Sequence, residues 1–384
     1  MKLRSTLAPV IVSTLLLTAA ACDSAKGGNA SAGTGTKTAT VMVMGQIGTP
    51  APPTGSYPGI VTSAKAAATA INAKGGVNGY TINVVSCNDN SNPNQAAKCA
   101  RDAVSQHVDA VVGLWTLYST NVYPILEAAK IPVLSSVMLG ANEATSSAAF
   151  PWFSGLPGQY IASAEDMIKL GCKKPAVIYY NITAGLLAPK YVDLDLSKHG
   201  MPASIHISAG SGGLPDYAPA IQSAVSQGAD CMMSGLAGSQ AAKLILANSA
   251  AGNPLTIGAF GNPVEIAVGQ VGDKGNGVFA IADSPLMTDT SNAAVARYLA
   301  DMKAVNAAST DIGDTPFIGW IGVQVFAQAL AKINGGTVDG PATVKALDGL
   351  HVTIPGFLDF TYQFNNSSDF SRVSNFQMIT YRVT

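Results

Sequence analysis

The sequence alternates short runs rich in β-branched residues with longer runs whose apolar residues recur at helical spacing, and this pattern continues through most of its 384 residues. Strands that alternate with helices indicate βαβ units, and therefore parallel sheets covered by helices. In the first half, strands are expected at 41–47, 81–86, 108–113 and 132–135, and helices at 59–73, 94–106 and 121–129.

A second set of alternating elements begins after the irregular stretch 148–158. The prediction is an α/β protein with two doubly wound parallel-sheet lobes of similar size. In this set, helices are expected at 159–170, 187–198, 218–227 and 239–250, and strands at 175–180, 204–208, 231–234 and 256–259.

The N-terminal residues carry an export signal. Lys2 and Arg4 precede an apolar run at 7–21, and about 15 apolar residues are too few for a membrane span, which needs roughly 20. The pattern predicts a cleaved signal peptide at 1–21.

The residues around Cys22 predict how the exported chain is held. Three alanines directly before Cys22 are similar to the lipobox of bacterial lipoproteins, in which the cysteine is lipidated and becomes the N-terminus. This resemblance implies an extracytoplasmic chain anchored to the cell membrane's lipid bilayer through Cys22. An ordinary secreted protein is the alternative. Residues 22–40 are rich in Gly, Ala, Ser and Thr and are expected to form a flexible tether.

Composition limits the partners of the folded part. The chain is 48% hydrophobic and 12% charged, which is ample for a large core. Its formal net charge is -1 and no run of basic residues is present. Nucleic acid is therefore not expected as a partner.

Five cysteines fit an exported protein, because one is assigned to lipid and four remain to pair. A bridge between Cys87 and Cys99 would fasten a strand end to the next helix, closing a loop of about 13 residues and stabilising by about 3 kcal/mol. Cys172 and Cys231 each precede a later strand, so they can also pair if those strands are neighbours. Two reduced, buried cysteines are the alternative for each pair.

The turn at 71–79 reads Ile-Asn-Ala-Lys-Gly-Gly-Val-Asn-Gly. Its glycines end a helix and supply positive φ. The string closely resembles the equivalent turn of the type I periplasmic binding proteins, in the group that binds leucine, isoleucine and valine for ABC importers. Further similar stretches lie at 87–89, 92–97, 111–113, 129–135 and 271–278.

The resemblance implies two lobes joined by three crossings, near Gly155, Ser284 and Pro355, with a small organic solute held in the cleft and closure of the lobes around it. It places lobe one at 41–155 plus 285–355 and lobe two at 156–284 plus 356–384. The aromatic and β-branched runs 357–362 and 376–383 are expected to enter lobe two as strands. The helix 316–332, which is uncharged as far as Ala331, is expected to be buried in lobe one.

The resemblance also implies a binding site at the carboxyl ends of the strands. In relatives that bind amino acids, hydroxyls and backbone amides of lobe one hold the carboxylate. The matching candidates here are Thr116 for the solute's carboxylate or carbonyl, Trp115 and Tyr118 for its body, and Ser136 as a second polar contact. Tyr57, near the exit of the first strand, is a further candidate.

The residue that would bind the α-ammonium group of an amino acid is harder to match with the relatives. The acidic partner of the relatives falls on Phe260, with Glu265 close by. If Phe260 is the closing group, an apolar or aromatic carboxylate or amide is favoured, since an ammonium without a carboxylate is costly to bury. If Glu265 takes that place, an amino acid is bound.

Enzyme classes are not supported by the sequence. The four histidines, His107, His199, His206 and His351, stand on separate elements without a carboxylate or cysteine at ligand or triad spacing. Nucleophile-elbow, phosphate-loop and dinucleotide-binding motifs are missing. The prediction is a non-enzymatic protein without metal or cofactor, whose partner is the ABC permease. A sensor subunit that presents a solute to a membrane receptor or kinase is the alternative.

Overall fold

The computed structural model describes residues 37–48, 56–134, 138–182, 184–236, 238–260, 269–366 and 369–383. The predicted signal peptide, Cys22 and most of the predicted tether lie outside these residues. Lys37 to Thr40, which were expected to belong to the tether, instead begin the first strand, because Ala39 is fully buried and Lys37 is paired with Tyr80 of the next strand.

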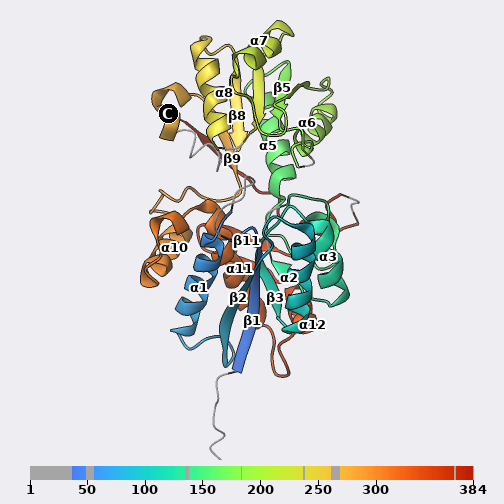
Figure 1. Cartoon of the computed structure of the whole chain (residues 1–384), viewed down its shortest axis with the longest axis vertical. Coiled ribbons are helices and arrows are strands. Elements are labelled where there is room, and N and C mark those ends of the chain that lie inside the picture. The colour runs from blue at the N-terminus through green and yellow to red at the C-terminus, as the bar shows by residue number, and fades with distance from the viewer. Residues whose placement is uncertain are drawn as a thin grey trace, which may run out of the picture. The chain divides into compact units, whose positions relative to one another are not determined.

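The first sheet has the strand order β2-β1-β3-β4, and every neighbouring pair is parallel (Figure 1). The strands are β1 (Lys37–Gly45), β2 (Tyr80–Asn88), β3 (Ala110–Trp115) and β4 (Val133–Leu134). The helices whose residues join its cores or follow its strands are α1 (Gly59–Asn72), α2 (Pro93–Ser105), α3 (Ser119–Ala128), α4 (Asn142–Thr145), α10 (Ala293–Ala304), α11 (Asp314–Leu330) and α12 (Gly340–Leu347).

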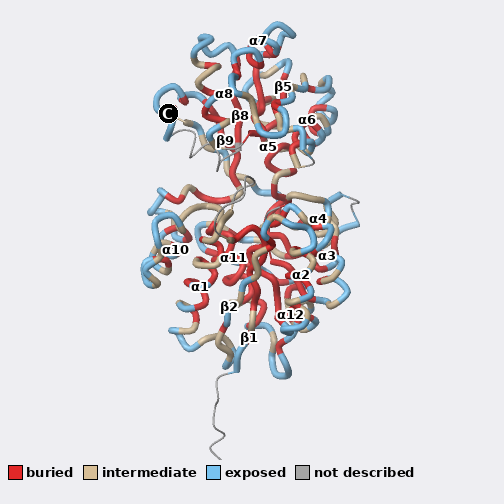
Figure 2. Tube along the Cα trace, in the orientation of Figure 1, coloured by how far each residue is buried: buried red, intermediate tan, exposed pale blue. Residues whose placement is uncertain are grey.

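Successive residues of β1 enter different cores. Val41 and Val43 pack in the core that contains α1 and α11, whereas Met42 and Met44 pack in the core that contains α2 and α3. Side chains of a strand alternate between the two faces of a sheet, so this sheet is covered by helices on both faces. Figure 2 shows the resulting buried strands in red.

The second sheet has the order β12-β9-β8-β7-β5-β6, in which only the edge pair β12 and β9 is antiparallel. Alternate residues again divide between two cores: Ile178 packs with α7 and α8, and Val177 with α5 and α6. The elements are α5 (Gly155–Lys169), β5 (Pro175–Tyr179), α6 (Leu187–Lys198), β6 (Ile205–Ser208), α7 (Ala218–Ser226), β7 (Cys231–Gly235), α8 (Gly238–Ala250), β8 (Thr256–Phe260), η1 (Gly272–Gly275), β9 (Phe279–Ala282) and β12 (Ile379–Arg382).

The α/β prediction is therefore confirmed, and each strand and helix expected in the two sets has its counterpart within a few residues. The expected helix at 316–332 is α11, which is buried along most of its length. Among the described residues, no helix has the length and apolar character needed to cross a membrane. The helices α10 and α12 and the short helix η2 (Ser309–Asp311) were not predicted.

The prediction for the run 357–362 is wrong. It forms β11 (Leu358–Thr361), which pairs antiparallel with β10 (His351–Ile354) in a separate two-stranded sheet. Leu358 and Tyr362 join the core of α1 and α11, and the Tyr362 hydroxyl donates a hydrogen bond to the Phe150 carbonyl at 2.9 Å. The later run does join the second sheet, as β12, so the last passage between the two sheets comes after β11.

Both predicted disulfides are present. Cys87 and Cys99 are joined with their Cα atoms 5.6 Å apart, and Cys172 and Cys231 with theirs 6.0 Å apart. The first links the end of β2 to α2, and the second links the turn after α5 to the start of β7.

The two bridges close loops of different length, since their cysteines are 12 and 59 residues apart in sequence. On the chain-entropy account, replacing both cysteines of a bridge with alanine should lower the free energy of unfolding by about 3 kcal/mol for Cys87 and Cys99, and by about 4 kcal/mol for Cys172 and Cys231. Urea unfolding of the two double variants measures this difference. Adding dithiothreitol should unfold the wild type at lower urea and leave a variant lacking both bridges unchanged; equal loss in the two double variants would contradict the expectation.

Candidate functional site

The carboxyl ends of β1 and β3 bring two of the predicted residues together. The backbone of Gln46, directly after β1, receives a hydrogen bond at its carbonyl from Tyr57 N–H and donates its own N–H to the Trp115 carbonyl, both at 2.8 Å. These bonds place the Tyr57 and Trp115 rings in contact, with centroids 4.5 Å apart and planes tilted by 56°. Both side chains are only half-buried, so this aromatic pair forms an apolar wall at the sheet edge where open α/β sheets bind ligands.

Thr116 and Tyr118 are engaged with the loop after β2. The Thr116 hydroxyl donates to Asp89 Oδ2 at 2.6 Å and accepts the Tyr118 N–H at 3.2 Å, and the Tyr118 hydroxyl donates to the Ser91 carbonyl at 2.6 Å. Thr116 is 2% exposed and Asp89 is 1% exposed. Asp89 is a buried carboxyl that needs donors, and Thr116 supplies one of them. The expectation that the Thr116 hydroxyl meets the solute is therefore not supported by this geometry.

The remaining candidates lie at or beyond the limits of the described residues. Ser136 and Glu265 are outside them, and Phe260 ends β8 with its side chain undescribed. The choice between Phe260 and Glu265 as the closing group stays a prediction.

Two carboxyl groups that were not predicted lie close to this region, Asp314 at the start of α11 and Asp283 directly after β9. Burial raises the pKa of Tyr57, and the Asp314 carboxylate raises it further, so Tyr57 and Asp314 share one environment. Burial also raises the pKa of Asp283 to about 7, with a smaller contribution from Asp314 that is partly offset by a hydrogen bond from Gln159. The charge of Asp314, in the first turn of α11, therefore acts on Asp283 at the end of β9.

Asp314 has an unsatisfied atom. Its Oδ2 is buried and has no hydrogen-bond partner among the described residues, and burial raises the pKa of this carboxyl. A buried carboxylate oxygen without a donor is costly, so such an atom favours a cation or a donor supplied from outside the chain. In the sequence, Asp283 follows an apolar strand and Asp314 precedes Pro316, and these positions could have drawn attention to both acids. Nothing in the sequence shows that the two acids are near each other.

Glu143 in α4 is a second feature that the sequence did not reveal. It is 3% exposed. Burial raises its pKa to about 8, and hydrogen bonds from its own N–H, from the Ser119 hydroxyl and from nearby backbone lower the pKa by less. Ser119 is the first residue of α3, so Glu143 fastens the start of α3 to α4.

Glu143 makes stability depend on pH. Its pKa is raised from 4.5 to about 8 in the folded protein, so between these values the folded protein holds a proton that the unfolded chain has released. The free energy of unfolding should therefore fall as pH rises from about 4.5 to about 8. Urea unfolding at both ends of this range should show a smaller fall for Glu143→Gln than for the wild type. The control is Glu127→Gln, which removes an exposed carboxyl whose pKa is lowered by Ser147 and Ser146; it should leave the fall unchanged, and an unchanged fall in Glu143→Gln would contradict the assignment.

The fold defines a class: an α/β protein of two units, each built on a largely parallel sheet, with an aromatic pair at the carboxyl ends of the strands of the first sheet. A family model described as periplasmic binding protein matches residues 46–376. The chain therefore belongs to the periplasmic binding protein family, whose members bind solutes outside the cytoplasm and are not enzymes. Its fold is the type I form. Comparison with curated proteins gives no match.

Solved structures agree on the fold. A branched-chain amino acid ABC transporter protein from Thermus thermophilus with bound valine has a TM-score of 0.76 and 13% identity, covering 91% of this chain and 94% of that one. A solute-binding protein from R. palustris in complex with 4-hydroxybenzoate has a TM-score of 0.69 and 18% identity, covering 90% and 97%. A fatty acid ABC transporter substrate-binding protein from Thermomonospora curvata has a TM-score of 0.71 and 15% identity, covering 90% and 88%.

Proposed function

We propose that this chain is the extracytoplasmic solute-binding subunit of an ABC importer and that its solute is a small organic molecule with an amino group, such as a branched-chain amino acid. Family membership and the similar structures of importer subunits support the general role. The observation that carries the choice of solute is Oδ2 of Asp314 beside Tyr57 and Asp283, which is buried and has no hydrogen-bond partner among the described residues.

The charges near the site favour an ammonium over a second carboxylate at this point. An anionic group placed beside Asp283 and Asp314 would be repelled, whereas an ammonium would compensate two carboxyls that burial has already made costly to ionise. The Tyr57 and Trp115 rings would pack against the apolar body of the solute.

A carboxylate on the same solute would have backbone donors nearby. The helices α1 and α3 both begin at this edge of the sheet, and neither has a side-chain hydrogen bond at its N-cap. Backbone N–H groups of a first helical turn favour anions. An amino acid carries both charges, so its ammonium could meet the two acids and its carboxylate could meet the helix N-termini.

A matched set of compounds tests this choice. Leucine, 4-methylpentanoate and 3-methylbutylamine share one apolar body and differ only in which charged group they lack. Leucine at about 100 times its Kd should raise the unfolding free energy by about 2.7 kcal/mol, and the two analogues should not at equal concentration. Thermal shift of the full chain measures this, with valine and isoleucine and their analogues as further sets. Stabilisation by the carboxylates alone would leave an importer subunit whose solute lacks an amino group.

The two acids should be needed for the amino solute. Asp314→Asn and Asp283→Asn keep the shape of the side chain and remove its charge, so each should weaken leucine binding by about 10 to 100-fold, which corresponds to the loss of a charged hydrogen bond. Isothermal titration calorimetry measures the affinity. The matched control is Asp273→Asn, at an exposed acid of η1, which should bind as the wild type does; equal binding in all three variants would remove both acids from the site.

Binding of an amino solute should also depend on pH through Asp283. Its pKa in the free protein is about 7, and only the ionised carboxyl attracts an ammonium. Affinity should therefore be higher at pH 8 than at pH 6, and Asp283→Asn should lose this difference. A wild type that binds equally well at both values would count against Asp283 as a solute contact.

We also propose that the permease contacts both lobes. Lobe one would hold the first sheet with β10 and β11, and lobe two would run from α5 to β9 and include β12.

We further propose that a signal peptide at 1–21 is removed and that lipid on Cys22 holds the chain at the membrane. Mass spectrometry of the mature N-terminus would detect the lipid, and Cys22→Ala should release the protein from the membrane fraction.

A further inference from the structure

Three side chains with metal-binding atoms meet on the outer side of α5 and α6. Glu165 lies on α5, Asp195 lies on α6, and His199 is the residue at the end of α6. Asp195 and His199 are four residues apart, which places both on one face of the helix. Their ligand atoms and that of Glu165 all lie within 4.8 Å of one another. The prediction that no histidine stands at ligand spacing from a carboxylate is wrong for His199.

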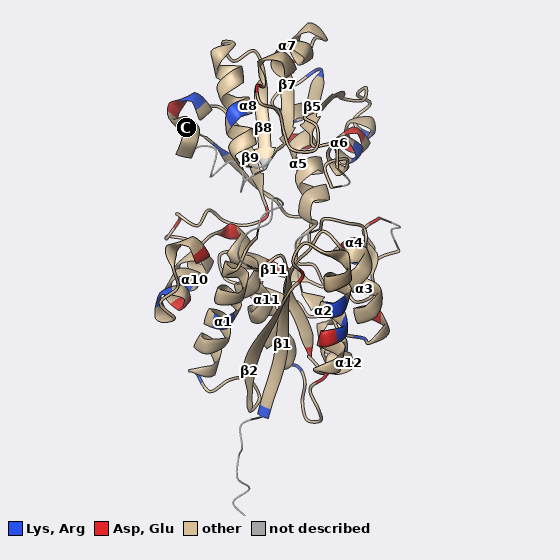
Figure 3. Cartoon of the chain, in the orientation of Figure 1, with Lys and Arg blue, Asp and Glu red and all other residues tan. Residues whose placement is uncertain are grey.

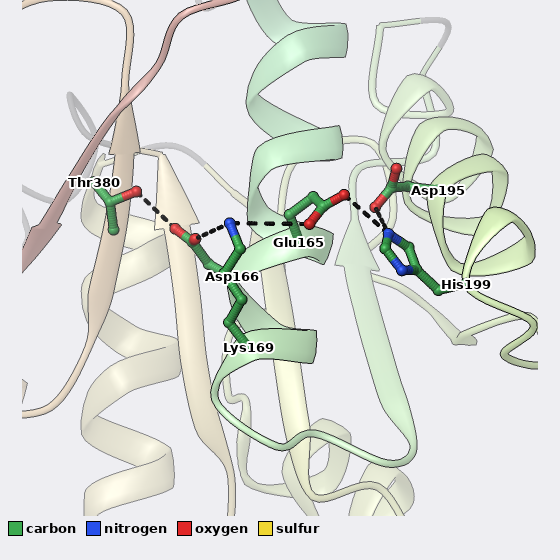
Figure 4. A network of polar contacts seen from close by, with 6 residues as sticks. All are labelled: Glu165, Asp166, Lys169, Asp195, His199 and Thr380. Carbon is green, nitrogen blue, oxygen red and sulfur yellow. Dashed lines mark hydrogen bonds and ion pairs between the residues drawn. The ribbon is translucent and has the colours of Figure 1, made fainter.

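The distances suit a tetrahedral ion. His199 Nε2 lies 2.9 Å from Glu165 Oε1 and 3.8 Å from Asp195 Oδ2 (Figure 4). Zinc binds nitrogen and carboxylate oxygen at about 2.0 to 2.2 Å, so two ligands of a tetrahedral site are about 3.4 Å apart. The observed separations lie on either side of that value. Small side-chain rotations would therefore bring the three atoms around one ion.

Asp195 gives an independent indication of a missing partner. The residue is 3% exposed, and its Oδ2 accepts no hydrogen bond within the part of the chain that the structure describes. This same oxygen is the one that faces His199 Nε2. A carboxylate oxygen that is buried without a donor and directed at an imidazole nitrogen is suited to a metal ion between them.

The surroundings of the three side chains would let an ion enter from solvent, and the nearby lysine does not take its place. The side chains of His199 and Glu165 are 38% and 35% exposed, which leaves a route from solvent and room for a water ligand. Lys169 Nζ lies 3.9 Å from the other oxygen of Glu165 and 3.7 Å from Asp166, which also accepts a hydrogen bond from Thr380, so Lys169 does not occupy the oxygen that faces His199. Figure 4 shows Lys169 on the opposite side of Glu165 from His199.

We propose that Glu165, Asp195 and His199 form a binding site for a divalent transition metal, Zn²⁺ above all, which joins α5 to α6. Two carboxylates and a neutral imidazole carry two negative charges, and a divalent ion neutralises them. The imidazole nitrogen selects against Mg²⁺ and Ca²⁺, which prefer all-oxygen sites. The site is separate from the solute site at the strand ends and does not depend on the nature of the solute.

The competing explanation is an ion-pair cluster in which protonated His199 lies between the two carboxylates and binds no metal. The full chain without a histidine tag should be stripped with EDTA and then titrated with ZnCl₂ in competition with a chromogenic chelator. One more equivalent of Zn²⁺ should bind to the wild type than to His199→Ala or Asp195→Asn, and Mg²⁺ and Ca²⁺ should not compete. Cys22 is present in every variant, so it cannot account for the difference.

The matched control is His206→Ala. His206 is also an exposed histidine beside a carboxylate, with Nε2 at 2.8 Å from Asp193 Oδ2, but it has one such neighbour rather than two. This variant should bind Zn²⁺ as the wild type does and keep the increase in melting temperature that Zn²⁺ produces. Glu165→Gln, at a partly exposed position, replaces His199→Ala if circular dichroism shows that the latter does not fold. Equal Zn²⁺ binding by the wild type and the folded site variants would overturn the proposal and leave an ion-pair cluster.

Discussion

The close approach of α11 to α1 and β3 fixes the geometry of the proposed solute-binding edge. A Cβ at Gly319 would overlap the Ile60 carbonyl of α1, a Cβ at Gly322 would come within 2.9 Å of Val112, and one at Gly113 within 2.8 Å of Ile60. The Ser63 hydroxyl adds a hydrogen bond from α1 to the Pro316 carbonyl. Because the backbones can approach this closely, the first turn of α11, the residues before α1 and the end of β3 meet at one edge of the sheet.

Buried polar groups support the same edge from behind. Thr116 with Asp89 ties the end of β3 to the loop after β2, and Glu143 with Ser119 ties the start of α3 to α4. The hydrogen bond within each pair holds the backbone of this edge in place. Burial opposes the ionisation of Asp283 and Asp314 as well, and Oδ2 of Asp314 has no hydrogen-bond partner among the described residues. Figure 3 shows Lys, Arg, Asp and Glu mainly on helices and loops.

Much of the fold could be predicted from the sequence because local patterns determine it. The valines and methionines of β1 alternate between two buried faces, and the cysteines stand at strand and helix ends that topology brings together. Other features depend on contacts between distant residues. The composition of β11 predicts a strand but not its partner, and Thr116 has a hydroxyl whose acceptor, Asp89, is unknown until β2 and β3 are placed. The proximity of Asp283 to Asp314 could not be predicted for the same reason.

The topology also determines how much of the chain must leave the ribosome before the first sheet is covered and the second is complete. One face of the first sheet is covered by α11, which is synthesised only after all the strands from β5 to β9. The second sheet in turn needs β12, near the end of the chain, to cover β9. Until then one sheet has an uncovered apolar face and the other an unpaired edge, both of which invite aggregation. The two folding units are therefore interleaved in the order of synthesis, and a chain cut short before β12 would leave the edge of β9 unpaired.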